Sequence, residues 1–361
     1  MKEYPIGLIP GPVSVPRKVR EAWLTDFASS DLEEDFFELY AQNQALLQKL
    51  LGTKERIVIT SGEAMSILWG ALKSALKPGN KLLAIASGLF GEGFADMAKS
   101  IGIEAETVSA SYDALPDPQK VREAALRFRP NVITAVHCET PSGTLTPLKE
   151  LGKIAREVDA LFMVDFVSSG GGVAVDVDAN FIDVGLLGSQ KVLSLPPSLS
   201  VSTISARAWS VFEKTNYSGY DAYLPWKSVP EVRYMPYTHD WHGMTALNIS
   251  LSSIMEEGME NAFARHARVA ALCRKRAREM ELELYPVSED ICSPTVSAFY
   301  IPKGWTWKEL DTALRARGMA VGGNYGPLAD KVFRIGHMGS QADETLVERG
   351  MTVLREVLQN K

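Results

Sequence analysis

ALFMVDFVSSGGGVAVDVDANFIDVGLLGSQKVLSLPP, residues 160–197, decides the fold, because it contains two short apolar runs that each lead into a polar group. The first run, 161–164, leads into Asp165, and the second, 184–187, leads through a Gly-Ser-Gln turn into Lys191. Short apolar runs bounded by turn residues indicate buried strands. If the two strands lie in one sheet, the acid and the lysine meet at the same edge and form a candidate site.

The preceding 150 residues repeat an alternation of short strands and helices. The pattern predicts helical structure over 17–52, 64–76, 92–101, 117–128 and 147–158, and strands over 55–60, 81–86, 104–108 and 132–137. Such alternation is typical of an α/β fold with a mostly parallel sheet that is covered by helices on both faces. In these sheets ligands bind beyond the carboxyl ends of the strands, where all the candidate turns of this chain are found.

The chain divides into three predicted parts. Residues 1–16 carry four prolines and are expected to form an extended arm. Residues 17–254 are expected to form the large domain, and 255–361 a smaller α+β domain, with a long helical stretch over 244–281 bridging the two. The small domain has predicted strands over 296–301 and 332–335 and predicted helices over 306–317 and 342–359.

Composition excludes several classes of protein. The 361 residues, 46% hydrophobic and 23% charged, have the composition of a globular protein, and the net charge of -6 argues against nucleic acid as the main partner. No run of about 18 apolar residues and no signal-peptide pattern is found, so we expect no membrane span. The cysteines Cys138, Cys273 and Cys292 form neither a disulfide framework nor a zinc pattern, which favours a cytoplasmic location.

Lys191 is the first candidate catalytic residue. A lysine that follows an apolar strand and precedes the mostly apolar stretch 192–204 is expected to be partly desolvated, which lowers its pKa and frees the amine for Schiff-base formation. Asp165 then has a matching task, because a buried carboxylate favours protonation of the ring nitrogen of pyridoxal 5'-phosphate. For either residue alone, a solvated surface lysine or a turn aspartate is the simpler alternative.

Further candidates follow other predicted strands. Ser61, Gly62 and Glu63 stand between a strand and a helix, where amide groups and the helix dipole favour a phosphate; an ordinary N-cap is the alternative. Because a carboxylate repels phosphate, the side chain of Glu63 is expected to turn elsewhere, for example toward substrate. Phe90 can stack on a planar ring or pack in the core. Thr140 can hydrogen-bond a ring hydroxyl of the cofactor.

Arg334 ends a predicted strand of the small domain. Its guanidinium is suited to bidentate binding of a substrate carboxylate, although a surface salt bridge is the alternative. Two other reactive side chains, Cys138 and His337, are assigned no catalytic role. Cys138 has no evident partner base and is expected to be a bystander rather than a nucleophile. His337 lies close to Arg334 along the chain, but no role follows from the sequence.

Together these segments resemble the class V aminotransferases of fold type I, and most closely the alanine/serine–glyoxylate (or pyruvate) branch. The motifs that carry the resemblance are PGPVSVP (10–16), SGEAM (61–65), ASGLFGEGF (86–94), HCETPSGTLTPL (137–148), VDFVSSGGG (164–172), GSQKVLSLPP (188–197) and RIGHMG (334–339). They occur in family order and span nearly the whole chain. The resemblance implies pyridoxal 5'-phosphate as cofactor and transamination between alanine or serine and glyoxylate or pyruvate.

The resemblance also implies a role for each candidate. Lys191 is the Schiff-base lysine, Asp165 the partner of the pyridine nitrogen, and Arg334 the carboxylate-binding residue. Thr238, with Tyr237 or Tyr234, matches a segment that reaches the phosphate of the neighbouring subunit, which implies a homodimer. The remaining implied cofactor contacts are Ser61, Gly62, Glu63 and Gln190 around the phosphate, Thr140 at the ring hydroxyl, and Val167 on the ring face opposite Phe90.

Several positions depart from the family pattern. Glu63 stands where the glyoxylate enzymes often have histidine, Phe90 where they often have tryptophan, and Ser198 where a glycine is usual. Several motifs are also similar to pyridoxamine–pyruvate transaminase, which takes the vitamin as substrate, but that enzyme has a second arginine where this chain has Tyr325. The expected substrate-binding residues are therefore Arg334, Glu63 and Tyr325.

Other functions stay open at this point. A 2-aminoethylphosphonate–pyruvate transaminase shares a similar segment after the strand at 132–137. A desulfurase or lyase on the same fold would need a mobile cysteine nucleophile, and none of the three cysteines lies in an evident flexible loop. A catalytically silent binding or regulatory module is disfavoured by the presence of lysine, acid and arginine together.

Overall fold

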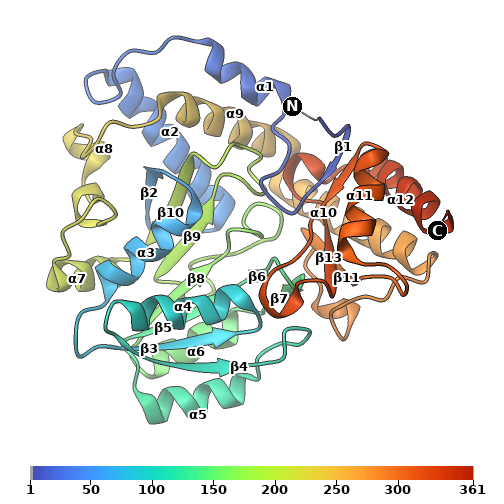
Figure 1. The fold of residues 1–361 in the computed structure, drawn as a ribbon. Helices are drawn as coiled ribbons and strands as arrows, with labels where there is room; N and C mark the ends of the chain where they lie inside the picture. Colours follow the sequence, from blue (N-terminus) through green and yellow to red (C-terminus); the bar gives the residue numbers. More distant parts are fainter. Residues whose placement is uncertain (1–2, 361) are drawn as a thin grey trace.

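A seven-stranded sheet forms the centre of the protein, which is described by a computed structural model over residues 3–360 (Figure 1). The strand order is β2-β10-β9-β8-β5-β3-β4. Only β10 runs antiparallel to its neighbours, so the predicted mostly parallel sheet is confirmed. The strands are β2 (Arg56–Ser61), β3 (Lys81–Ala86), β4 (Glu104–Ser109), β5 (Val132–Val136), β8 (Leu161–Asp165), β9 (Val184–Gly188) and β10 (Leu199–Ile204).

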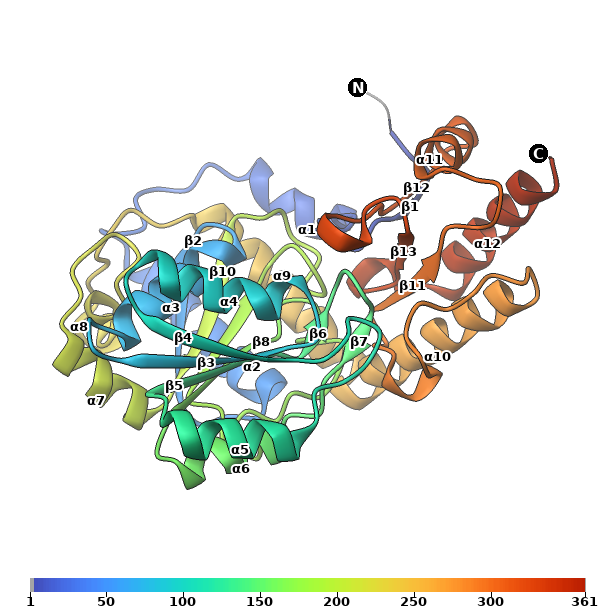
Figure 2. The same cartoon turned by 60° about the horizontal axis from the view of Figure 1, so that its bottom comes forward.

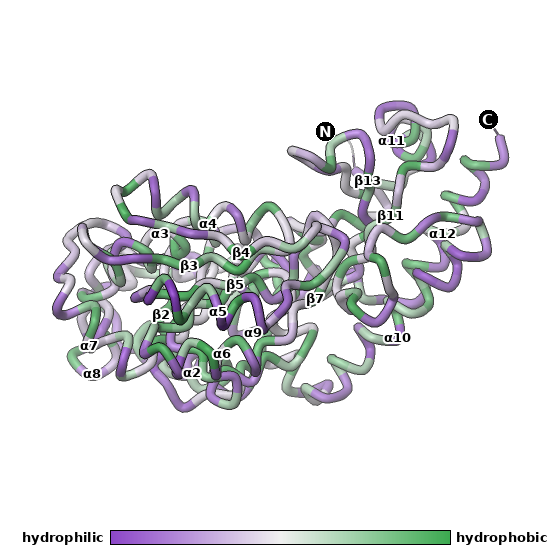
Figure 3. Tube along the Cα trace, turned by 90° about the horizontal axis from the view of Figure 1, so that it is seen from below, coloured by the Kyte–Doolittle hydropathy of each residue, from purple (hydrophilic) through white to green (hydrophobic). Residues whose placement is uncertain are grey.

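Helices cover both faces of this sheet. In Figure 2, α3 (Ala64–Ala75) and α4 (Leu89–Ser100) lie on one face, and α5 (Pro118–Phe128) and α6 (Lys149–Glu157) lie on the other. Every residue of β5, β8 and β9 is buried, as expected for strands that are covered on both sides. Figure 3 shows mainly hydrophobic residues in the layer of strands. Hydrophilic residues are frequent on outer helices such as α10 (Met259–Arg278) and α12 (Glu344–Gln359).

The helical stretch predicted over 17–52 is interrupted. The structure has α1 (Arg17–Arg20), a 3-10 turn η1 (Glu21–Leu24) and α2 (Glu34–Leu51), with residues 25–33 in irregular chain. The interruption contains Ser29, Ser30 and Asp31, whose side chains favour turns over helix interiors. The Ser30 hydroxyl accepts a hydrogen bond from the His239 amide at 2.9 Å, which ties the interruption to a distant segment.

The single long helix predicted over 244–281 is two helices. Helix α9 (Trp241–Glu257) packs against α2 in the part that contains the large sheet, and α10 packs against α12 beyond it. They are separated at Gly258, whose φ of 86° lies in the region that glycine adopts readily. The chain therefore changes direction at this glycine as it leaves the large sheet.

The C-terminal part has its own hydrophobic core and includes chain from the N-terminus. Strands β11 (Val296–Tyr300) and β13 (Val332–Gly336) pair antiparallel, while β1 (Ile6–Leu8) pairs parallel with β12 (Met319–Val321). Ile6 and Leu8 are buried with Phe299 and Phe333 in this core. The predicted arm is thus extended at 6–8. The predicted domain boundaries, 1–16, 17–254 and 255–361, stay a prediction, and residues 1–2 and 361 lie outside the described chain.

The remaining elements are short or lie at the periphery. Helix α11 (Trp307–Ala316) begins with a capping box in which Thr306 and Glu309 bond each other's backbone amides. Within residues 3–360, no helix is long and apolar enough to cross a membrane. The other elements are β6 (Cys138–Glu139), β7 (Thr144–Leu145), α7 (Ala206–Thr215), α8 (Val229–Val232), and the 3-10 turns η2 (Leu224–Trp226), η3 (Glu289–Ile291), η4 (Gly326–Leu328) and η5 (Gly339–Gln341).

Candidate active site

A cavity of about 280 Å³ lies at the carboxyl ends of β8 and β9, where the two strand-end groups meet. Strands β8 and β9 are parallel neighbours, which brings Asp165 and the turn that carries Lys191 to the same edge of the sheet. The cavity is lined by Gly11, Pro12, Glu63, Ala64, Met65, Leu68, Phe90, Cys138, Thr140, Asp165, Val167, Ser168, Gln190, Lys191 and Pro197. Most of the predicted cofactor residues therefore share one cavity.

Lys191 is the amine of this cavity. Its Nζ donates a hydrogen bond to the carbonyl oxygen of Pro10 at 2.6 Å, and a β-carbon at Gly11 would clash with the lysine side chain. Burial lowers the pKa of Lys191 to about 8, helped by the positive charge of Arg334 and opposed by Asp165. The lysine is thus partly neutral near pH 8, as a nucleophilic amine requires.

This lowered pKa predicts how the reactivity of Lys191 depends on pH. Only the neutral amine is acylated, so the rate of acetylation by acetic anhydride should rise about tenfold per pH unit below pH 8 and level off above it. Peptide mass spectrometry of the ligand-free protein measures this rate, with the exposed Lys153 of the same digest as reference. A half-maximal rate near pH 10.4, the ordinary value for lysine, would contradict the prediction.

Asp165 is the buried acid of the cavity. Its Oδ1 accepts a hydrogen bond from the Val167 amide at 2.8 Å, and we find no other hydrogen bond to this carboxylate within residues 3–360. Burial raises the pKa of Asp165 to about 6, although the Val167 amide and Lys191 both act to lower it. A buried carboxylate with one free oxygen facing a cavity can accept a proton or hydrogen bond from a bound cation.

The predicted phosphate turn joins β2 to α3. Gly62 has a φ of 124°, so it adopts a backbone conformation that other residues rarely reach, and its amide donates to Ser198 O at 2.8 Å. Glu63 is exposed and lines the cavity at the N-terminus of α3, where no side chain caps the helix. Gln190 carries a buried amide oxygen without a hydrogen-bond partner. An uncapped helix end beside an unsatisfied amide suits a bound polar group.

Two walls of the cavity are formed by residues that follow different strands. Phe90 lies in the first turn of α4, and Val167 follows β8, so an aromatic and an aliphatic side chain both line the space beside Asp165. Thr140 hydrogen-bonds the hydroxyl of Ser168 through its own hydroxyl. A flat ring fits between an aromatic and an aliphatic side chain with its edges toward polar groups.

Arg334 is 4% exposed and makes no ion pair in the described chain. Its guanidinium donates to backbone carbonyls, Gly323 O at 2.8 Å through Nε and Thr140 O at 3.5 Å through Nη1. The ring of Tyr325, which is 56% exposed, lies 5.0 Å from the guanidinium carbon. A buried cation that is held only by carbonyls keeps its charge available for an anion, such as a carboxylate.

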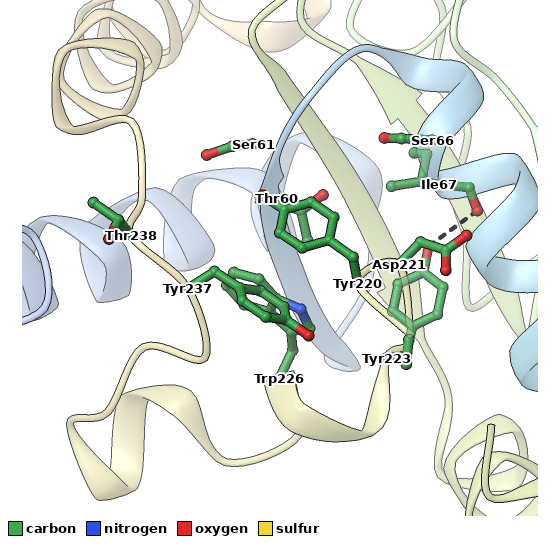
Figure 4. A pocket seen from close by; sticks show the side chains of 11 residues that line it. Thr60, Ser61, Ser66, Ile67, Tyr220, Asp221, Tyr223, Trp226, Tyr237 and Thr238 are labelled. Atoms are coloured by element: carbon green, nitrogen blue, oxygen red, sulfur yellow. Dashed lines mark hydrogen bonds between the residues drawn. The ribbon is translucent and has the colours of Figure 1, made fainter. Parts of the chain in front are cut away.

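Seven predicted site residues do not line this cavity: Ser61, Gly62, Tyr234, Tyr237, Thr238, Tyr325 and Arg334. Tyr237 and Thr238 line a separate pocket of about 30 Å³ that also includes Ser61 (Figure 4). There Tyr237 packs against Tyr220 with ring centroids 4.5 Å apart. Tyr234 is exposed. Within one chain these tyrosines and Thr238 do not reach Lys191, so their expected cofactor contact requires a second subunit.

Sequence reasoning missed several residues of the cavity. The hydroxyl of Ser168, the carbonyl of Pro10 and the buried carboxylate of Glu139 all take part in its contacts. These residues lie in motifs that the sequence showed, but no pattern predicted that the carbonyl of Pro10 would bond the amine of Lys191. Cys138 lines the cavity, and burial raises its pKa to about 11, so the thiol stays protonated and does not act as a nucleophile at neutral pH.

The family described as aminotransferase class V matches residues 23–328. The chain belongs to the class V aminotransferases. This class V aminotransferase is 34% identical over 339 residues to an uncharacterized aminotransferase of Methanocaldococcus jannaschii, a match that covers 92% of this chain and 87% of that protein. It is 30% identical over 368 residues to pyridoxamine–pyruvate transaminase of Mesorhizobium japonicum, covering 98% of this chain and 93% of that one.

A solved structure supports the same assignment. The alanine–glyoxylate aminotransferase of Nostoc sp. superimposes with a TM-score of 0.95 at 28% identity, covering 99% of this class V aminotransferase and 96% of the Nostoc chain. The resemblance and the fold inferred from the sequence are therefore confirmed. The protein is an enzyme, which excludes a silent binding module.

Proposed function

We propose that this enzyme catalyses pyridoxal-5'-phosphate-dependent transamination between a small amino acid, alanine or serine, and a 2-oxo acid, glyoxylate or pyruvate. The observation that carries the proposal is a desolvated lysine, Lys191, that shares a cavity with the buried acid Asp165 while Arg334 lies unpaired beside it. The alanine–glyoxylate and pyridoxamine–pyruvate enzymes among its relatives give independent support.

The residues of the cavity fit this cofactor. The unsatisfied oxygen of Gln190 and the uncapped N-terminus of α3 suit the phosphate end, Asp165 suits the ring nitrogen, and Phe90 and Val167 suit the two ring faces. When bound, the cofactor supplies an electron sink that stabilises negative charge at the substrate Cα.

The chain's own side chains perform the remaining tasks. The amine of Lys191 would hold the cofactor, and when free it could take a proton from the substrate Cα and return it. The Asp165 carboxylate would favour a proton at the ring nitrogen of the cofactor. Arg334 binds the carboxylate common to amino acid and oxo acid, which orients Cα toward Lys191.

Replacing Asp165 by asparagine tests the role of the acid. The amide has no negative charge to hold a proton at the ring nitrogen, so kcat should fall by roughly 100-fold or more, the scale of a lost charge-assisted interaction in a dry site. Steady-state kinetics measure the change. Asp117→Asn, at the exposed N-cap of α5, is the matched control. A D165N enzyme within threefold of the wild-type kcat would contradict the assignment.

A donor–acceptor screen tests the substrates. The purified enzyme is offered alanine, serine, aspartate, aminoethylphosphonate and pyridoxamine as donors, each with glyoxylate and pyruvate, and products are measured by mass spectrometry. Alanine or serine should give the highest kcat/KM with glyoxylate or pyruvate. If neither amino acid is used by a protein that binds the cofactor, the proposed substrates are wrong.

Glu63 favours a second candidate function, pyridoxamine–pyruvate transamination. Its exposed carboxylate lines the cavity and has no hydrogen bond or ion pair in the described residues. A free carboxylate at the expected phosphate position repels a phosphate but accepts a hydrogen bond from a hydroxymethyl group. Free pyridoxamine acting as donor, with pyridoxal as product, would establish this function, and Glu63→Gln should then weaken pyridoxamine binding.

We also propose a cytoplasmic homodimer with active sites at the subunit interface. Support comes from Tyr237 and Thr238, which lie outside their own cavity, and from exposed apolar residues nearby, including Tyr220, Val232 and Tyr234. Light scattering should give twice the chain mass of 39.6 kDa. A monomer that transaminates at the full rate would contradict the interface sites.

A further inference from the structure

Glu139 is a fully buried carboxylate with no role in the chemistry described so far. It ends β6, and its two carboxylate oxygens accept hydrogen bonds from the amides of Phe90, at 3.3 Å, and Gly91, at 2.7 Å. These amides belong to the first turn of α4, whose own N-cap residue, Gly88, has no side chain. The cap of α4 therefore comes from a strand about 50 residues later.

The space for this carboxylate is made by glycine. A β-carbon at Gly88 would lie 2.6 Å from the carboxylate carbon of Glu139, and one at Gly91 would lie 2.7 Å from the Cα of Ala86. The start of α4 is thus held closely between the end of β3 and the Glu139 side chain. The helix predicted to begin at residue 92 begins at Leu89 because this distant residue supplies the missing acceptor.

The same side chain connects two residues that line the cavity. Phe90 and Thr140 both line the cavity. The Phe90 amide bonds the Glu139 carboxyl group, and Thr140 is the next residue along the chain. The backbone oxygen of Glu139 accepts from the Gly143 amide at 2.8 Å, which fixes the turn that follows Thr140. Any shift of Glu139 therefore moves Phe90 relative to Thr140, across the width of the cavity.

Glu139 is not half of a structural ion pair. No lysine or arginine contacts it in the part of the chain that the structure describes, and its partners are the amides at the positive end of the α4 dipole. Burial raises the pKa of Glu139 to about 8, while the two amide hydrogen bonds act to lower it. An unpaired buried carboxylate is costly, so a compensating function is expected for it.

We propose that Glu139 is a positioning residue for the reaction, because it fixes the first turn of α4 and so places the Phe90 ring against the cofactor. The proposal rests on the proposed function, since it takes a pyridoxal-type ring as the ligand of the cavity. Glu139 touches neither substrate nor cofactor and acts through Phe90.

Calorimetric titration of the apoprotein with pyridoxamine 5'-phosphate tests the proposal. This ligand forms no covalent link, so its Kd reports the shape of the site without turnover. At pH 9, where Glu139 with its pKa of about 8 is ionised and both oxygens accept, Glu139→Gln should raise the Kd about tenfold, because the amide group accepts one hydrogen bond but presents N–H to the other helix amide. Asp183→Asn is the matched control: Asp183 is also a buried carboxylate of the sheet, but it lies before β9, at the opposite end from the cavity. D183N should lower the Tm and leave the Kd unchanged.

A double-mutant cycle separates positioning from general stability. If Glu139 acts through Phe90, E139Q should change the Kd less than twofold in a Phe90→Ala background. The proposal would be overturned if E139Q changed the Kd by the same factor in both backgrounds. It would also be overturned if the Kd of the E139Q single variant lay within twofold of the wild-type value. Gly88→Ala, which displaces the carboxylate without removing it, should reproduce the weaker binding if E139Q does not fold; unchanged binding in G88A also overturns it. Failure of the wild-type apoprotein to bind the ligand would count against the proposed cofactor instead.

Discussion

Lys191→Ala should abolish transamination and the visible absorbance of the bound cofactor. In the proposed mechanism the variant loses both the amine that would hold the cofactor and the base for the Cα proton, so kcat should fall more than about 1000-fold. Steady-state kinetics and an absorption spectrum of the purified protein measure the two effects. Among single substitutions in the cavity, this one should have the largest effect, because no other amine lines the cavity in the described chain.

The control for this variant is Lys153→Ala, an exposed lysine of α6 that should keep full activity and colour. Loss of folding is not expected in K191A, because removing a desolvated amine relieves a burial cost. With both proteins free of cofactor, the Tm of K191A should therefore equal or exceed that of the wild type. Retention of turnover, or of the visible band, in a folded K191A protein would remove Lys191 from the mechanism.

Arg334→Ala should raise the KM of both the amino acid and the oxo acid and lower kcat/KM by about 100- to 1000-fold. This range follows from losing the proposed bidentate, charge-assisted interaction with the carboxylate that both substrates share. Initial rates over a range of each substrate measure it. Arg334→Lys should recover only part of the loss, because an ammonium keeps the charge but not the planar fork of donors.

Arg122→Ala provides the comparison, since Arg122 forms an exposed ion pair with Glu157 far from the cavity. Its kcat/KM should match the wild type. An unchanged KM for both substrates in R334A would show that another group binds the carboxylate. A selective loss for one substrate would likewise contradict a shared carboxylate site.

Much of the fold was predictable because its signals are local. The apolar runs that end at Asp165 and before Lys191 are buried strands, and their parallel pairing follows from the strand–helix alternation around them. Those two residues and Thr140 line one cavity, as the strand ends indicated, and so do Val167 and Gln190, which the family resemblance implied. Regular spacing and strand direction were sufficient for Asp165 and Lys191, whereas Val167 and Gln190 required the resemblance.

The missed features depend on contacts between distant residues. Helix α4 begins early because Glu139 caps it from another strand, and the chain between α1 and α2 is held open partly by a bond from His239. The break at Gly258 was visible as a glycine, but periodicity on both sides of it favoured continuity. Tyr237 and Thr238 line a pocket separate from that of Lys191, which agrees with the resemblance-based expectation that they serve a neighbouring subunit.

The pairing of β1 with β12 has a consequence for synthesis of the chain on the ribosome. Ile6 pairs with Met319, so β1 can pair only after a strand about 310 residues later has been made, roughly 15–60 s at ordinary rates of translation. The segment that follows β1 carries Pro10, whose carbonyl binds Lys191. Completion of the catalytic centre is therefore a late, post-translational event, and deleting the first eight residues should impair maturation of the enzyme as well as its stability.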